Sequence, residues 1–330
     1  MSKWYSSECA DNDVVLFSKV RLSRNLSDTP FKNKMSREIR KNTAKKLYAC
    51  VKNSELARDF DIIDLAACSA VKAVSYAEKQ YITPEFAKEK GAFLLSADED
   101  VSIMLCGEDH IRITAFAGGL ATEKAYARAN RVDDVFIKNM KIAFDERLGF
   151  LTASPLNIGT GMKVSIALHL PAIKSNGGIS RLASMVGKLG LSLRPLYSER
   201  GAFYLLSNHI SMGISEKAAI DNINAVTAQI IRQERGLREV MKGSEAWEDR
   251  LFRSLGTLKM ARRLDFGEFI ELISDVRLGI TLGLFEEDLF NVEYLIHNLA
   301  DGTVLADSED VSGPDIAPKI RANIIREKLK

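Results

Sequence analysis

The chain has 330 residues, of which 46% are hydrophobic and 27% charged, and its formal net charge is +2. These values exclude a disordered chain, and so small a net charge gives no sign of a nucleic-acid-binding or membrane-surface protein. The length favours two domains of ordinary size. The opening residues lack the apolar core of a signal peptide, and no apolar run approaches the ~18 residues of a membrane span, so we expect a cytoplasmic protein.

The first part of the chain predicts a mixture of strands and helices. Residues 14–24 alternate as a half-buried strand does, and residues 38–57 have helical spacing and composition. Further strands are predicted at residues 92–96, 101–106 and 110–116. The polar turn 107–109 joins the last two as a hairpin. Residues 123–144 predict one long amphipathic helix.

The middle of the chain continues this pattern. Residues 151–171 predict a Pro/Asn/Gly-rich turn that leads into a strand. The segment ISRLASMVGKLG predicts a helix that ends at Gly190, a residue type typical of helix C-termini. The segments LSLRPLY and FYLLSNHI, with a loop between them, predict another hairpin.

The pattern changes at about residue 215. Ser215 is a candidate N-cap for a long helix, and nearly everything after it has helical spacing. We therefore expect an α+β domain at residues 1–235 and an all-helical domain at residues 236–330.

Cysteines and histidines give no indication of a metal site or of disulfides. The four cysteines are far apart and lack Cys-x-x-Cys or Cys/His spacing, so we expect free thiols at Cys9, Cys50, Cys68 and Cys106. His110 and His169 have no second ligand at metal spacing, which favours packing or hydrogen-bonding roles.

Charged residues gather at predicted strand ends and turns. They form a cationic set, Lys19, Arg21, Arg112, Lys163 and Arg194, together with the isolated carboxylates Glu108 and Glu199. Such a set suits a polyphosphate, because cations can bind phosphate oxygens and neutralise the charge of a phosphoryl group in transfer. Each signal alone has a plainer interpretation, since a Gly-x-Gly is more often a simple turn and a strand Arg beside an acid is more often a surface ion pair.

The combination is more specific than its parts. In this order, the segments SKVRLSRN, EDHIRI, SPLNIGTGMKVSIALHLP, RPLYSER and SDVRLGITLGL resemble the phosphagen (guanidino) kinase family, most closely its bacterial protein arginine kinase branch. The resemblance covers most of the chain, from Trp4 to the IIREKL segment near the end. It implies the guanidino kinase catalytic fold, an antiparallel sheet flanked by helices, with Mg2+ and ATP as donor complex and a guanidinium as acceptor.

The resemblance also implies residue roles. The phosphate-binding positions of the family fall on Lys19, Arg21, Arg112, Lys163 and Arg194, its substrate carboxylates on Glu108 and Glu199, and its reactive cysteine on Ser154. The chemistry agrees, because a guanidinium has a pKa above about 12 and no free lone pair. It becomes a nucleophile only if carboxylates orient it and take a proton.

The family's small-molecule kinases carry a helical domain before the SKVR-type strand, whereas here that strand begins close to the N-terminus. An open acceptor site with an added helical C-terminal domain resembles the enzyme that phosphorylates arginine side chains of proteins. In that branch the C-terminal domain mediates dimerisation and phosphoarginine recognition. The resemblance further implies a homodimer, a zinc-finger activator protein and the Clp degradation machinery as partners, with no nucleic acid or membrane.

Several active-site positions depart from the family pattern. Lys19 and Lys163 replace arginines, which keeps the charge but loses the planar fork, and Ser154 replaces a potential thiolate. In the loop RPLYSERGA, Arg200 is placed to pair with Glu199. Two hypotheses therefore remain: an active protein arginine kinase, and a catalytically weakened paralogue that binds nucleotide, phosphoarginine or a partner and regulates without turnover. A free-arginine kinase is a distant third.

Overall fold

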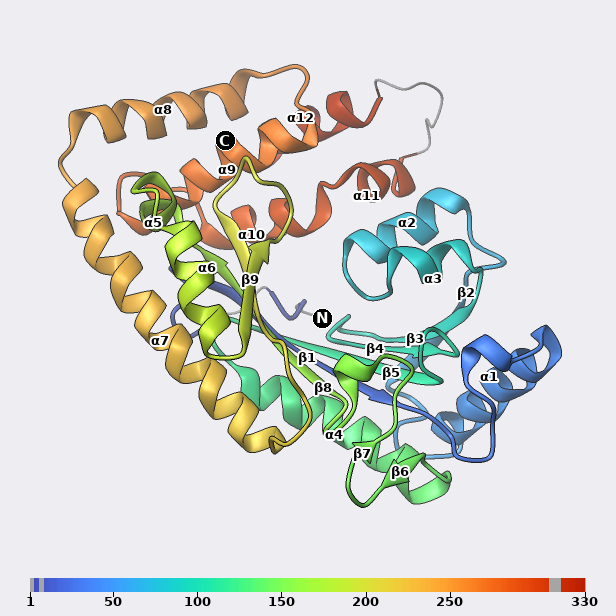
Figure 1. Ribbon diagram of the computed structural model, residues 1–330. Coiled ribbons are helices and arrows are strands. Elements are labelled where there is room, and N and C mark those ends of the chain that lie inside the picture. The colour runs from blue at the N-terminus through green and yellow to red at the C-terminus, as the bar shows by residue number, and fades with distance from the viewer. Residues whose placement is uncertain (1–2, 6–8, 309–315, 330) are drawn as a thin grey trace.

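The computed structural model describes residues 3–5, 9–308 and 316–329. Its centre is one antiparallel sheet with strand order β2-β3-β4-β5-β1-β8-β10-β9 (Figure 1). The strands are β1 (Val15–Arg24), β2 (Phe60–Asp64), β3 (Ala92–Ser96), β4 (Val101–Leu105), β5 (Ile111–Gly118), β8 (Met162–His169), β9 (Leu191–Pro195) and β10 (Phe203–Asn208). A separate small hairpin pairs β6 (Phe144–Asp145) with β7 (Gly149–Phe150).

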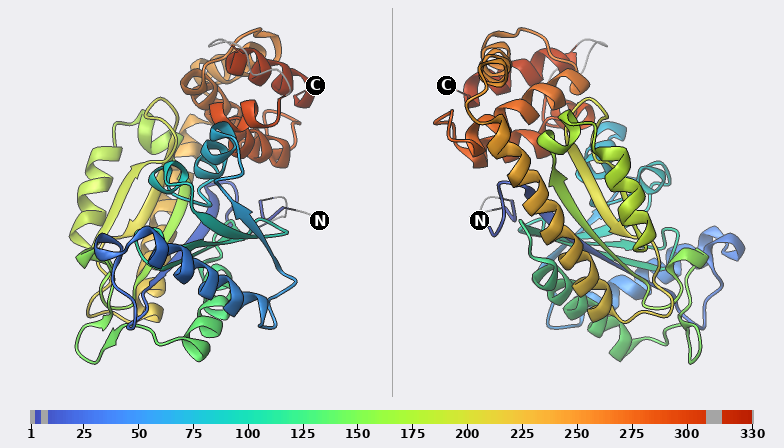
Figure 2. Two further views of the ribbon diagram at one scale, coloured as in Figure 1. Left: turned by 90° about the vertical axis from the view of Figure 1, so that its right-hand side faces the viewer. Right: turned by 60° about the vertical axis from the view of Figure 1, so that its left-hand side comes forward.

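Helices account for most of the remaining chain. They are α1 (Arg37–Lys52), α2 (Ala70–Glu78), α3 (Pro84–Lys88), α4 (Thr122–Asn139), α5 (Pro171–Ser175), α6 (Ile179–Lys188), α7 (Glu216–Met241), α8 (Glu245–Met260), α9 (Phe266–Thr281), α10 (Leu289–Asn298), α11 (Asp301–Ala306) and α12 (Ile316–Lys328), with short 3-10 turns at Lys32–Lys34 and Pro155–Asn157. Helices α8 to α12 form a separate group at one end of the sheet, and the long helix α7 leads to them (Figures 1 and 2).

The strand alternation divides the sheet into two different faces. In β1, Val20 and Leu22 point into the core that packs against α1, α4, α6 and α7. The residues between them point to the opposite face, because successive side chains of a strand alternate. On that face Phe17 and Phe203 pack with α9 and α10 of the helical group. Beyond this contact the strands carry the charged residues of the candidate site.

The structure confirms the α+β class with an antiparallel sheet flanked by helices and a helical C-terminal region. The predicted boundary between residues 235 and 236 lies inside α7 and stays a prediction.

The predicted helix 123–144 is too long, because α4 ends at Asn139. The following residues turn back as the β6–β7 hairpin. The Asp145 carboxylate accepts hydrogen bonds from the backbone N–H groups of Arg147 and Leu148, and this local turn competes with helix continuation. Strand β2 and helices α2 and α3 were not predicted.

In the part of the chain described, Cys50, Cys68 and Cys106 are free thiols, as expected. None of the helices there combines the length and apolar character that a membrane crossing requires.

Candidate active site

Five cationic side chains meet on the face of the sheet opposite the long helices. They come from four strands: Lys19 and Arg21 from β1, Arg112 from β5, Lys163 from β8 and Arg194 from β9. All five line one pocket of about 390 Å³. Thus the structure brings together every cation of the set identified in the sequence.

The arrangement of these cations opposes folding unless an anion is bound. Arg21 lies directly opposite Lys163 in the β1–β8 register, and like charges at such positions destabilise a sheet. Burial, and then the nearby guanidinium and ammonium groups, lower the pKa of Lys19 to about 7. The pKa of Arg21 falls to about 10, mainly through burial and then through Arg112, and that of Lys163 is also lowered by burial. A bound polyanion would relieve both effects.

Two amide side chains orient the central cations. The Lys19 ammonium donates to Gln80 Oε1 at 2.6 Å, and Arg21 Nη2 donates to Asn157 Oδ1 at 2.8 Å. The Nε–H groups of Arg21 and Arg112 are buried and have no partner within the described chain. Because buried donors are nearly always paired in proteins, these two point to a ligand with acceptor oxygens, as phosphate has.

Apolar and aromatic side chains line the same pocket. It is lined by Leu196 and Tyr197 from the β9–β10 loop, Leu205 from β10, and Tyr81 and Ile82 after α2. Apolar and aromatic side chains suit the flat ring of a nucleobase. The pocket therefore combines cations suited to phosphate with apolar side chains suited to a base.

Glu108 lies at the tip of the β4–β5 hairpin. Its carboxylate forms an ion pair with Arg112, and its side chain is 50% exposed. The neighbouring Asp109 is buried and accepts hydrogen bonds from Asn25 Nδ2 and from the backbone N–H of Ala153, each at 2.8 Å. These bonds hold the hairpin tip against the segment that carries Ser154.

Ser154 caps the 3-10 turn that opens the segment SPLNIGTG. This segment depends on glycine, since Gly159 has φ +111° and Gly161 has φ +61°. A Cβ at Gly159 would lie 2.3 Å from the Ser211 carbonyl oxygen. Of the described residues, those from 154 to 161 do not line the pocket. The segment contributes indirectly, through Asn157 on Arg21.

Glu199 lies on the loop between β9 and β10 and, like Glu108, falls outside the described residues that line the pocket. Lys174 Nζ donates to the carbonyl oxygens of Glu199, Arg200 and Gly201, each at 2.7 Å. The expected pairing of Arg200 with Glu199 is wrong. Arg200 Nε instead donates to Glu271 of α9 at 3.0 Å, so the loop is attached to the helical group.

Sequence reasoning missed Gln80 and Asn157. Asn157 stands inside a segment already singled out, and its amide beside two glycines was an available signal. Gln80 had none, because it follows α2, a helix that was not predicted, and reaches Lys19 across 61 positions of sequence. Its backbone has φ +62°.

A magnesium ion fits this site only together with a ligand. Among the described residues, no three His, Cys, Asp or Glu side chains gather closely enough to hold a metal ion. The cationic pocket, however, suits the phosphate oxygens that commonly carry Mg2+. Any magnesium would therefore be bound mainly through phosphates.

The fold and pocket define a protein with a cationic pocket on one face of an antiparallel sheet. Two family models match: "ATP:guanido phosphotransferase, C-terminal catalytic domain" over residues 41–237, and "Protein-arginine kinase McsB C-terminal domain" over residues 244–330. Proteins named protein-arginine kinase from Clostridium acetobutylicum and Brevibacillus brevis are each 35% identical to the chain, covering 100% of it and 100% and 95% of their own lengths. The chain therefore belongs to the ATP:guanido phosphotransferase family, in its protein-arginine kinase branch.

Solved structures show the same fold at low sequence identity. The duplicated taurocyamine kinase from Schistosoma mansoni in its substrate-free form is 20% identical, with a TM-score of 0.62, and the match covers 78% of this chain and 40% of that one. Lombricine kinase is 17% identical, with a TM-score of 0.58, over 74% of this chain and 71% of its own.

Proposed function

We propose that this protein is an ATP-dependent protein arginine kinase that transfers the γ-phosphoryl group of ATP to arginine side chains of proteins. The observation that carries the proposal is the single pocket that joins five cations, two of them with unpartnered Nε–H donors, to apolar and aromatic side chains. The names of its full-length relatives support the choice of acceptor.

The cations perform the first part of the reaction. Arg21 and Arg112 offer unpartnered donors to phosphate oxygens, while Lys19, Lys163 and Arg194 add positive charge around them. This arrangement would stabilise the charge on the phosphoryl group as it leaves the β-phosphate. Magnesium, when bound, supplies further neutralisation of the phosphate oxygens. The base would pack against Leu196 and Tyr197.

Glu108 is the candidate proton acceptor. It pairs with Arg112, which lines the pocket, and it is half exposed, so a side chain from another protein can reach it. The attacking arginine nitrogen would form the N–P bond, the bond from phosphorus to the β-phosphate oxygen would break, and the proton of that nitrogen would pass to Glu108. We also propose Glu199 as the second carboxylate and Ser154 as a polar neighbour of the acceptor.

The proposed partners follow from the acceptor. Protein substrates with accessible arginines fit an open site. A zinc-finger activator, Clp-type degradation of the marked proteins and a homodimer formed through the helical group are further proposals that rest on the family resemblance.

One observation favours the second candidate, a weakened paralogue that binds without turnover. The loop that carries Glu199 is attached to α5 by Lys174 and to α9 by Arg200. If the loop stays there, the second carboxylate does not reach the acceptor. Such a protein would bind nucleotide, phosphoarginine or a partner protein and regulate it.

The test is phosphoryl transfer from Mg-ATP to an arginine-rich unfolded protein, detected by mass spectrometry without acid because the P–N bond is acid-labile. We expect Glu108→Gln to reduce transfer by roughly 100-fold or more and to leave nucleotide binding intact. Glu146→Gln, at an exposed position outside the pocket lining, is the matched control. Nucleotide binding without any transfer by the wild type would favour the paralogue.

A further inference from the structure

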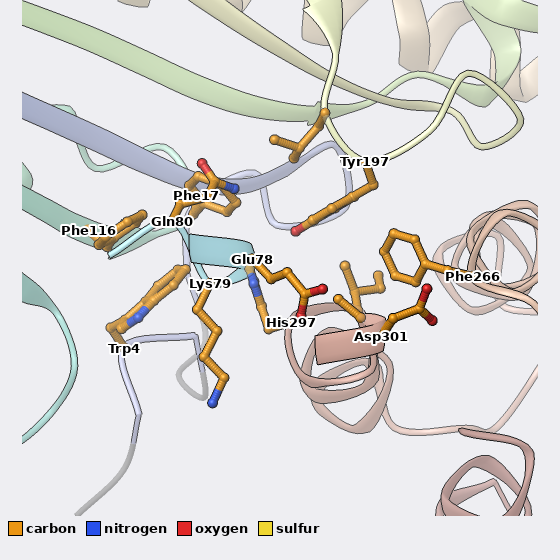
Figure 3. Close-up of a pocket in the computed structure, with 13 residues that line it drawn as sticks. Trp4, Phe17, Glu78, Lys79, Gln80, Phe116, Tyr197, Phe266, His297 and Asp301 are labelled. Carbon is orange, nitrogen blue, oxygen red and sulfur yellow. The ribbon is translucent and has the colours of Figure 1, made fainter. Parts of the chain in front are cut away.

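Gln80 occupies an unusual position between two cavities. It lines the cationic pocket and also a second cavity of about 220 Å³ between the sheet and the helical group (Figure 3). Its backbone has φ +62°, a conformation that few residues other than glycine adopt. Its backbone N–H donates to Ala77 O at the end of α2, which fixes the residue at this point.

Within the described residues, the Lys19 ammonium has one direct hydrogen-bond partner, the Gln80 side chain. An ammonium can only donate, so the amide oxygen must face it, at 2.6 Å. The charges around Lys19 otherwise oppose its protonation: Arg21, Arg112, Lys163 and Arg194 line the same pocket, and Glu78 is the acidic side chain there. Gln80 therefore stabilises the charged form of a lysine that its other neighbours push toward neutrality.

Gln80 is in turn anchored to the helical group through Glu78. The Glu78 carboxylate accepts hydrogen bonds from the backbone N–H groups of Gly302 and Thr303 at 2.9 and 2.7 Å, and from Thr303 Oγ1 at 2.8 Å. These contacts place a carboxylate at the start of α11. In Figure 3 Glu78 extends toward Asp301 while Gln80 lies beside the β1 strand. Glu78 and Gln80 thus connect α11 to Lys19 in the cationic pocket.

We propose that Gln80 is a positioning residue that keeps the Lys19 ammonium charged and directed into the anion pocket, and that the Glu78–α11 contact holds Gln80 in place. This inference rests on the proposed function, because the charge on Lys19 matters only if the pocket binds an anion. It explains how Lys19 can bind an anion in its charged form although the neighbouring cations favour its neutral form.

The test is calorimetric titration with ATP and, separately, with inorganic tripolyphosphate from pH 5.5 to pH 8.5. Burial and the neighbouring cations lower the pKa of Lys19 to about 7 when no ligand is bound. Above that pH, Lys19 must therefore take up a proton when an anion binds. We expect Gln80→Leu to weaken binding roughly tenfold at pH 8, with a smaller effect at pH 5.5 where Lys19 is already charged. Protonation of the ligand itself cancels when the dissociation constant of the variant is divided by that of the wild type at the same pH.

Three further variants separate positioning from a simple fold defect. Gln80→Asn suits the positive φ but is too short to reach Lys19, so it should behave as Gln80→Leu. In a Lys19→Met background, Gln80→Leu should add no further loss. Thr303→Val, which lies outside the pocket lining and preserves the side-chain shape, should weaken binding roughly twofold with the same pH signature. Gln233→Leu, on the exposed side of α7, is the control.

The outcomes are distinct. If Gln80→Leu weakens ligand binding equally at all pH values, or still weakens it in the Lys19→Met background, the inference is wrong. The proposed function would then remain intact. If neither ATP nor tripolyphosphate binds the wild type, both fail.

Discussion

At the scale of single residues, Asn157 connects the glycine-rich turn to the anion pocket. Its Oδ1 accepts a hydrogen bond from Arg21 Nη2. The Nε–H group of the same arginine has no partner within the described chain. Asn157→Ala removes this orienting bond, and we expect the dissociation constant for ATP to rise about five- to tenfold, which corresponds to a hydrogen bond worth about 1–1.5 kcal/mol. Titration with ATP measures it. Asn42→Ala, at an exposed position of α1, should change nothing; equal affinities for both variants would contradict the assignment.

Gly159 tests the turn itself. Any side chain there is strained by φ +111° and meets the Ser211 carbonyl oxygen at 2.3 Å. We expect Gly159→Ala to lower the free energy of unfolding by about 2 kcal/mol or more. The control is Gly187→Ala in α6, where an added Cβ meets nothing within 4 Å. That change should raise stability by up to about 1 kcal/mol, because alanine favours a helix. Chemical denaturation of both variants measures the contrast.

At the scale of elements, the β9–β10 loop is the segment whose position decides between the two candidate functions. The Arg200–Glu271 pair is about half exposed on both sides, and such pairs contribute less than about 1 kcal/mol. Lys174, by contrast, donates to three backbone carbonyls, and its loss leaves all three without this donor.

We therefore expect graded local effects from two variants of this loop. Arg200→Ala should speed amide hydrogen exchange at residues 196–202 by a few-fold, and Lys174→Met by more, with little change in the melting temperature because the attachments are local. If the loop must leave α9 for turnover, phosphoryl transfer should rise in Arg200→Ala. Mass spectrometry measures the amide exchange, with residues 92–96 of β3 as internal reference. Unchanged exchange at residues 196–202 in both variants would contradict this view.

The strands and long helices were predictable because their signals are local. The alternation in residues 14–24 and the helical spacing after Ser215 reflect which side chains are buried, and the structure has β1 and α7 there. The five cations were identified as charges at predicted strand ends and turns, and the family resemblance gave them their phosphate-binding role. Their meeting in one pocket required the sheet order, which local patterns do not specify. Gln80 was not predictable, since its role depends on a contact between α2 and β1 that no periodicity records.

At the scale of the whole molecule, the anion pocket and the helical group share elements. Helix α7 runs from the sheet core into the helical group, α11 meets α2 through Glu78, and the loop carrying Glu199 lies on α9 (Figure 1). Arg277 of α9 is fully buried and pairs with Glu293 of α10. Removing one member of such a pair leaves the other charge buried alone and costs several kcal/mol. A change in the helical group can therefore reach the pocket by two routes, through α2 and through the loop.

Buried histidines make the stability of the whole molecule depend on pH. Burial lowers the pKa values of His110, His169 and His297, the last to about 3, and His297 of α10 packs against the Trp4 ring (Figure 3). The unfolded chain takes up these protons near pH 6.5 and the folded chain does so at lower pH, so stability is full above about pH 6.5 and falls as the pH drops below it. At pH 5.5 each histidine that stays neutral in the fold costs about 1.4 kcal/mol.

Denaturant unfolding at pH 7.5 and pH 5.5 measures this dependence, and His297→Gln isolates one part of it. We expect the variant to lose about 1.4 kcal/mol less than the wild type between the two pH values, even if it is less stable at both. Most carboxylates titrate below this range, and the change at Lys19 lies mainly above pH 7, so neither obscures the difference. His209→Gln, at an exposed position, is the control. Equal pH dependence in the wild type and His297→Gln would show that His297 accepts a proton in the fold, against the burial that the structure gives it.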